Sequence, residues 1–194
     1  MIIIQNHKSK PESILKKYPD ATLIDVTSKS ESEYVKLSPF YPHRLIPVPF
    51  SGGWKAACVE AVWQGLKVFE HEDVNTALFS NDTMKNIKRT VKKHGRTLGH
   101  RKGVAGKELL DYVEARKQIY IPTYQWMLEH RAMSLVEKLR EEAKDKTVVL
   151  LDYNTNCDVD DPSSPLSHAF LIKAYIEGIY PFDATSADSE AKSE

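Results

Sequence analysis

The sequence lacks the features that mark several large classes of protein. Its 194 residues include two cysteines, Cys58 and Cys157, which argues against a disulfide framework and favours a reducing compartment. Lys and Arg number 27, as do Asp and Glu, and this balance excludes a histone-like polycation and an acidic disordered chain. No run approaches the ~20 apolar residues of a membrane span, and the apolar start is too short for a signal peptide. We therefore expect a cytoplasmic protein that does not bind membranes.

Short strands and helices alternate along the chain. Residues 2–4 and 22–27 are rich in β-branched side chains and are predicted to be strands, with a short helix over 11–18 between them. This β-α-β opening predicts two neighbouring parallel strands. Near the other end of the chain, a buried strand is expected over 147–153 and a last helix over 166–179.

Three longer helical regions are expected between these ends. The strongest prediction is Trp54–Phe69, which is apolar nearly all round and has Ser51 as a candidate cap. A second, very basic helix is predicted over Asp73–Thr97. A third covers Lys107–Lys144, with an interruption or kink at Pro122.

These elements predict an α-rich α/β fold. We expect residues 1–36 to form a small β-α-β extension packed on the core, 37–182 to form the main domain, and 183–194 to form a flexible acidic tail. Leu37–Pro49 contains four prolines together with apolar residues, so it is expected to be an ordered, extended segment.

A polar stripe interrupts the apolar helix. Glu60, Gln64 and Lys67 follow one another at spacings of four and three, so on a helix they share one face. Because the rest of the helix is typical of a buried one, the stripe faces either water or a cavity. In the second case a carboxylate, an amide and an amine point into one pocket.

Eight cationic residues without an intervening acid lie between Met84 and Gly103. They are Lys85, Lys88, Arg89, Lys92, Lys93, Arg96, Arg101 and Lys102, and His94 and His100 lie among them. Such a run indicates either a solvated basic face or a partner that carries phosphate, on a nucleotide or on a nucleic acid. The spacing of the nearby glycines matches neither a P-loop nor a dinucleotide-binding motif.

An acidic loop follows the last predicted strand. Its polar residues are Asp152, Asn154, Asn156, Asp158, Asp160, Asp161, Ser164, Ser167 and His168. Carboxylates at the carboxyl end of a buried strand are well placed for a site. The alternation of Asn156, Asp158 and Asp160 resembles a calcium loop, but the required Gly and Glu are absent, so we expect no metal site. The plain alternative is turn chemistry, with Ser164 or Ser167 capping the last helix.

Two segments of the sequence match a known pattern: Leu37–Pro42 reads LSPFYP, and Val59–Phe69 reads VEAVWQGLKVF. They resemble the L-S-N-F-Y-P-like segment and the V-E-h-x-x-Q-x-x-K-F helix of the NADAR superfamily of N-glycosidases. A basic glycine-containing stretch, an Arg-led helix, a strand and an acidic loop then follow in the family's order. The resemblance covers about residues 37–168. Pro39 replaces the family's Asn, and the Trp-Gly pair that usually follows the late Asp is absent.

The resemblance implies a NADAR-like domain that hydrolyses an N-glycosidic bond without metal or cofactor. The implied substrate is a phosphorylated ribosyl compound: an ADP-ribose conjugate, an ADP-ribosylated base, which can be attached to nucleic acid, or a ribosylamino-pyrimidine. Glu60 and Lys67 fall on the family's catalytic Glu and Lys, and its late Asp falls at Asp158 or Asp160. The substrate-binding residues that we expect are Phe40, Tyr41, Gln64, Arg96, His100, Arg101 and Lys102.

Two other functions fit parts of the sequence. A non-catalytic nucleic-acid-binding protein would use the stretch Lys85–Lys102 and would leave Glu60 and Lys67 without a role. A metal-dependent sugar transferase would use Asp158 and Asp160. Burial of Glu60 and Lys67 around a pocket separates the N-glycosidase from the first alternative, and dependence on metal separates it from the second.

Overall fold

The N-terminal sheet is completed by a strand from the far end of the chain. In the computed structural model, which describes residues 1–180, β8 (Val148–Asp152) lies between β1 (Ile2–Asn6) and β2 (Thr22–Asp25) and is parallel to both. All three strands were predicted, but the expectation that the first two are neighbours is wrong. The apolar run of β8 is suited to the central position, where a strand has neighbours on both edges and is covered on both faces.

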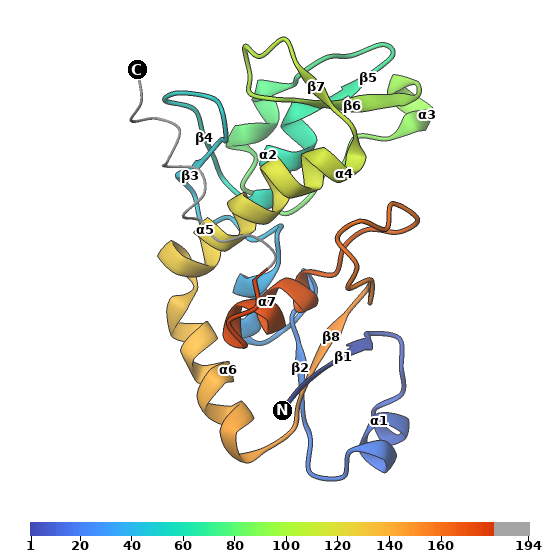
Figure 1. Cartoon of the computed structure of the whole chain (residues 1–194), viewed down its shortest axis with the longest axis vertical. Coiled ribbons are helices and arrows are strands. Elements are labelled where there is room, and N and C mark those ends of the chain that lie inside the picture. The colour runs from blue at the N-terminus through green and yellow to red at the C-terminus, as the bar shows by residue number, and fades with distance from the viewer. Residues whose placement is uncertain (181–194) are drawn as a thin grey trace.

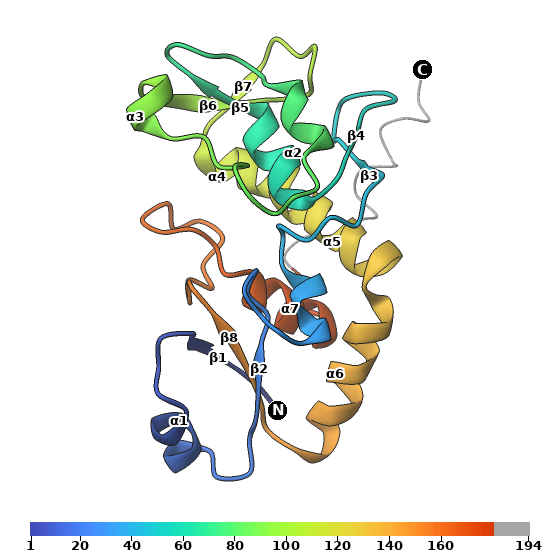
Figure 2. The same ribbon diagram turned by 180° about the vertical axis from the view of Figure 1, so that it is seen from behind.

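Helices cover this sheet and connect it to the rest of the molecule (Figure 1). The helix α1 (Pro11–Lys17) links β1 to β2, and α6 (Met133–Asp145) leads into β8. The last helix, α7 (His168–Ile176), packs on β1 and β8, and Figure 2 shows η1 (Glu33–Leu37) beside it. Ser167 caps α7, because its hydroxyl accepts the N–H of Phe170.

The other half of the molecule holds two small antiparallel sheets around the helix α2 (Val59–Leu66). One pairs β3 (Ile46–Pro47) with β4 (Lys55–Ala56). The other has the order β5 (Lys67–Phe69), β6 (Thr97–Arg101) and β7 (Leu109–Leu110). One buried apolar cluster, which includes Val62, Tyr124 and Leu150, joins both halves. The division at residue 36 stays a prediction, and the predicted tail 183–194 lies outside the described residues.

The helix α2 spans Val59–Leu66 and is shorter than the predicted Trp54–Phe69. At its start, residues of the predicted helix pair with β3 instead, and Cys58 rather than Ser51 is the cap, its sulfur accepting the N–H of Ala61 at 3.3 Å. At its end the chain becomes extended and joins β6. Lys67 is therefore the first residue of a strand and not part of the helix.

Close packing explains the glycine near the end of α2. A Cβ built on Gly65 would lie 2.2 Å from the ring of Phe79, in the short helix η2 (Thr76–Ser80). Any larger side chain would force the two elements apart. All eight residues of α2 are buried, including the polar Glu60 and Gln64.

The basic region Asp73–Thr97 is largely irregular, and the helix predicted there is wrong. Only η2 and α3 (Val91–His94) are helical within it. The side chain of Asn81 accepts the N–H of Thr83 and donates to the carbonyl of Lys85. Such local bonds satisfy backbone groups that a helix would otherwise use.

The region Lys107–Lys144 begins with β7 and then forms one long helical rod. It consists of α4 (Tyr112–Ala115), the π-helical η3 (Arg116–Tyr120) and α5 (Ile121–Arg131). Pro122 lies in the first turn of α5, directly after the wider π turn, and does not interrupt the rod. The break comes at Ala132, before α6. Within residues 1–180, no helix is both long and apolar enough to span a bilayer.

Candidate functional site

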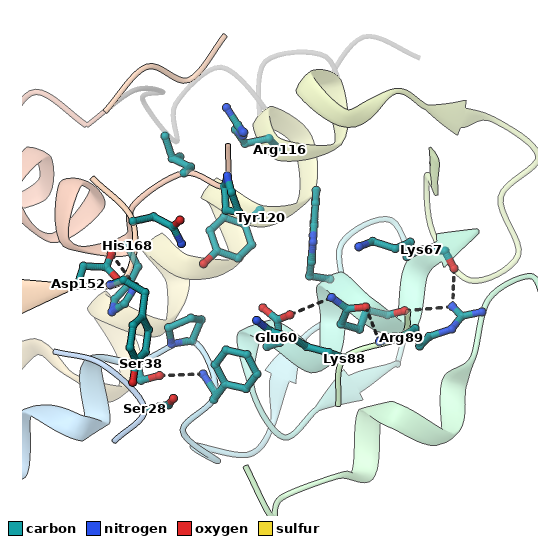
Figure 3. A pocket seen from close by; sticks show the side chains of 18 of the residues that line it. Ser28, Ser38, Glu60, Lys67, Lys88, Arg89, Arg116, Tyr120, Asp152 and His168 are labelled. Atoms are coloured by element: carbon teal, nitrogen blue, oxygen red, sulfur yellow. Dashed lines mark hydrogen bonds and ion pairs between the residues drawn. The ribbon is translucent and has the colours of Figure 1, made fainter. Parts of the chain in front are cut away.

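A cavity of about 450 Å³ opens between α2 and the carboxyl end of β8 (Figure 3). Its walls come from segments far apart in the sequence: the turn after β2, the segment at Ser38–Phe40, α2, β5, the residues 88–90, η3 and the start of α7. Most of its charged side chains are cationic, namely Lys67, Lys88, Arg89, Arg116 and, as shown below, His168. The anionic ones are Glu60 and Asp152.

The structure brings Glu60, Gln64 and Lys67 together on one wall of this cavity. Glu60 is 7% exposed, and its Oε1 accepts a hydrogen bond of 2.9 Å from Gln64 Nε2. No described residue donates to its second oxygen, Oε2. One carboxylate oxygen is thus available to a molecule in the cavity.

Burial shifts the pKa values of both Glu60 and Lys67. It raises the pKa of the Glu60 carboxyl, although the bond from Gln64 and the charges of Lys88 and Lys67 act in the opposite direction. It lowers the pKa of the Lys67 amine, which the nearby Arg89 and Lys88 lower further and Glu60 raises. A lower pKa brings a lysine closer to its nucleophilic, neutral form.

Arg89 holds Gln64 and Lys67 in place through hydrogen bonds. Its backbone N–H donates to Gln64 Oε1 at 3.1 Å, and its Nη1 donates to the carbonyl of Lys67 at 2.5 Å. Its Nη2 pairs with Glu72 at 3.1 Å. The neighbouring Lys88 is exposed and has no carboxylate partner among the described residues, and its Nζ lies 5.4 Å from the Phe40 ring centroid. Arg89 is therefore a positioning residue, whereas Lys88 is available to an anion.

A buried ion pair forms the opposite wall. Asp152 ends β8, and its Oδ2 accepts from the Ser167 hydroxyl at 2.7 Å and lies 3.1 Å from Nδ1 of His168. Its Oδ1 accepts the N–H of Tyr153 at 2.6 Å. Burial alone would raise the pKa of Asp152, but His168, the Ser167 hydroxyl and the N–H of Ala169 outweigh it and lower the pKa to about 2. Asp152 is therefore a permanent carboxylate whose oxygens are already in use.

His168 is the cationic partner of that carboxylate. Its Nε2 lies 2.9 Å from the carbonyl oxygen of Val26, so both ring nitrogens face acceptors. Burial opposes the charge, but Asp152 raises the pKa of His168 above its usual value. Sequence analysis named both residues in the acidic loop but assigned neither a catalytic nor a binding role. The available signal was a buried strand that ends in Asp, followed by a Ser-His helix start.

Arg116 holds the acidic loop through its backbone. The guanidinium is 2% exposed and donates to four carbonyls, from Asp158, Val159, Asp161 and Ser164. The side chains of Asp158 and Asp160 are on the surface, and Asp160 pairs with Lys117 at 2.6 Å. Neither lines the cavity, so the structure does not place either predicted catalytic Asp beside Glu60.

Most of the predicted substrate-binding residues also lie outside the cavity. Phe40 and Gln64 line it, whereas Tyr41 packs on His43 with ring centroids 4.8 Å apart. Acids outside the basic run neutralise three of the cations: Glu70 pairs with Arg96, Asp73 with Arg101, and Glu108 with Lys102. His100 is fully buried and stacks on Trp63 at 3.7 Å, so it supports the wall without reaching the cavity.

Residues 6–172 match a sequence family described as a family of unknown function, DUF6939. The chain belongs to this family. No match was found among curated proteins. The part that matches DUF6939 contains every residue that lines the cavity, from Ser28 to His168.

Proposed function

We propose that this protein is a NADAR-like N-glycosidase that hydrolyses the bond between ribose C1′ and a base or amine nitrogen in a phosphorylated ribosyl compound. ADP-ribose conjugates and ribosylamino-pyrimidines belong to this class. One observation carries the proposal: Glu60, with a free carboxylate oxygen, and Lys67 share a cavity whose charged side chains are mostly cationic. A negatively charged, phosphorylated substrate fits such a cavity.

The chemistry follows from the charge that develops during cleavage. As the C1′–N bond breaks, its electron pair leaves with the nitrogen and C1′ becomes positively charged. The ionised Glu60 stabilises that charge, and a water molecule adds to C1′, losing one proton as the leaving nitrogen gains one. Alternatively the neutral amine of Lys67 attacks C1′ as the C1′–N bond breaks, and a proton of the amine passes to the leaving nitrogen. The sugar ring of this lysine adduct then opens to an imine, and water hydrolyses the imine to the free sugar and the amine.

The substrate's phosphate is expected to contact Lys88. Lys88→Ala should raise KM about fivefold to tenfold with a smaller effect on kcat, because a charge-assisted contact made equally in ground and transition states is lost. Added salt should weaken binding by the wild type more than by the variant. Arg101→Ala is the matched control, since Arg101 pairs with Asp73 outside the cavity and its loss should leave KM within twofold. Equal KM values for Lys88→Ala and the wild type would contradict this assignment.

The activity is tested with a panel of N-ribosylated nucleotides, ribosylamino-pyrimidines and ADP-ribosylated DNA, followed by mass spectrometry of the released base and sugar. Release from none of them rules the proposal out. On a substrate that is cleaved, borohydride should trap a sugar adduct on Lys67 if the imine route operates. Its absence with an active enzyme assigns Lys67 an electrostatic role.

The two alternative functions have less support. Of the eight cations in Lys85–Lys102, Arg89, Arg96, Arg101 and Lys102 pair with carboxylates, which weakens the case for a continuous nucleic-acid surface. For a metal-dependent transferase, Asp160 is paired with Lys117, and residues 1–180 contain no group of three or more His, Cys, Asp or Glu placed to hold a metal ion.

A further inference from the structure

Tyr120 presents a phenol to the cavity, and its hydroxyl has no hydrogen-bond partner among residues 1–180. The residue lies at the end of η3 and lines the cavity, and Figure 3 shows its hydroxyl directed into the space that Glu60 and Asp152 border. No described residue accepts a hydrogen bond from it. One turn later on the same rod, Tyr124 is fully buried and its hydroxyl donates to the carbonyl of Leu37 at 2.6 Å. The contrast indicates that the Tyr120 hydroxyl is available to form a hydrogen bond with a molecule bound in the cavity.

The π turn keeps this phenol on the cavity side of the rod. Tyr112, Arg116 and Tyr120 line the cavity at spacings of four. In a regular α-helix, residues eight positions apart are rotated by about 80° from one another. The π-helical stretch Arg116–Tyr120 has more residues per turn, which offsets this drift. π-helical turns within helices are frequent at functional sites.

The protonation of the phenol limits what it can do. Burial, and then the negative charges of Glu60 and Asp152, raise the pKa of Tyr120 well above its usual value. At neutral pH it therefore keeps its proton and acts as a hydrogen-bond donor. Glu60, in contrast, offers a free carboxylate oxygen that accepts only.

We propose that Tyr120 is a further catalytic residue of the N-glycosidase, whose O–H donates to a ribose hydroxyl next to C1′ while that hydroxyl donates to Glu60 Oε2. A hydroxyl suits this place because it accepts from one group and donates to the other, whereas a carbonyl or an unprotonated ring nitrogen only accepts. The inference rests on the proposed function. The role of Tyr120 adds that the site recognises a hydroxyl of the ribose next to the C1′–N bond that breaks.

The test compares Tyr120→Phe with Tyr124→Phe on a panel member that the wild type cleaves. Hydrogen bonds to a sugar hydroxyl next to the reacting carbon strengthen in the transition state, so Tyr120→Phe should lower kcat about tenfold or more and change KM less. The shape of the pH profile should stay the same, because the phenol does not titrate in this role. Tyr124→Phe, which loses a structural hydrogen bond, should lower the melting temperature and keep kcat within twofold.

The outcomes separate the two proposals. Turnover by Tyr120→Phe within twofold of the wild type overturns the role of Tyr120 and leaves the N-glycosidase intact. A pH profile that loses its alkaline limb in the variant also overturns it, since Tyr120 would then transfer a proton. A wild type that cleaves no panel member overturns both proposals.

Discussion

Glu60→Gln is expected to lower kcat by ~10²-fold or more while the protein stays folded. The amide has the shape of the carboxylate and can still bond to Gln64, so the loss reports the negative charge beside C1′. Removing a charge that burial disfavours should not reduce stability, so the melting temperature should equal or exceed that of the wild type. Steady-state kinetics and thermal unfolding on the same samples measure both quantities. Unchanged turnover would remove Glu60 from the mechanism.

The pH dependence of kcat/KM distinguishes the ionised role of Glu60 from that of a proton donor. Burial raises the pKa of Glu60, so a reaction that needs the carboxylate should increase with pH through a midpoint above the usual range for Glu. Gln64→Met removes a hydrogen bond that lowers this pKa, and the acid limb should move further toward neutral pH. A rate that falls as the pH rises through this range would instead make Glu60 the acid.

Asp152→Asn is expected to reduce the free energy of unfolding by about 3 kcal/mol or more, because it leaves a buried histidine cation without its counter-ion. Asp152 is 2% and His168 8% exposed, so water compensates little. Urea denaturation at neutral pH measures the loss. Asp160→Asn is the control, since this exposed acid pairs with Lys117 at the surface and its loss should hardly move the midpoint. Equal midpoints for Asp152→Asn and the wild type would show that the pair does not stabilise the fold.

The pair Asp152–His168 also predicts how the difference in unfolding free energy between the wild type and Asp152→Asn varies with pH. The pKa of Asp152 is lowered from 3.8 to about 2 by folding, so its contribution is complete above pH 3.8 and is lost as the pH falls toward 2. The pKa of His168 is raised, so the histidine's share is complete below its usual value of 6.5 and declines as the pH rises through the higher pKa of the folded state. The difference in unfolding free energy between the wild type and Asp152→Asn should therefore decrease as the pH falls from 3.8 toward 2.

Sequence patterns predicted the features that depend on residues close together in the chain. The strands β1, β2 and β8 follow from their β-branched runs, and the Glu60–Gln64 stripe follows from helical spacing. The spacing of Lys67 suggested a helix, yet its side chain reaches the cavity from a strand. Lys67 still lines the same cavity as Glu60 and Gln64, because the chain turns immediately after Leu66 and not because the helix continues.

The pairings that sequence analysis missed depend on contacts between distant segments. Nothing local pairs Asp152 with His168, or Arg89 with Glu72, and each pair forms only when the segments that carry its two residues pack together. Arg96 and Arg101 were expected to bind substrate because they lie in a run of cations that no acid interrupts, but Glu70 and Asp73 reach them in space. Charge along a chain therefore overstates the charge that a surface presents.

The central position of β8 affects the order in which the chain can acquire structure during synthesis. Ile2 pairs with Val148, and Thr22 pairs with the same residue from the other side. β1 and β2 are synthesised long before β8, so they have no partner in this sheet until nearly all of the described chain has emerged. Contacts so distant in sequence carry a large loop-closure cost and favour slow folding. We expect nascent chains that stop before β8 to remain sensitive to protease and to depend on chaperones.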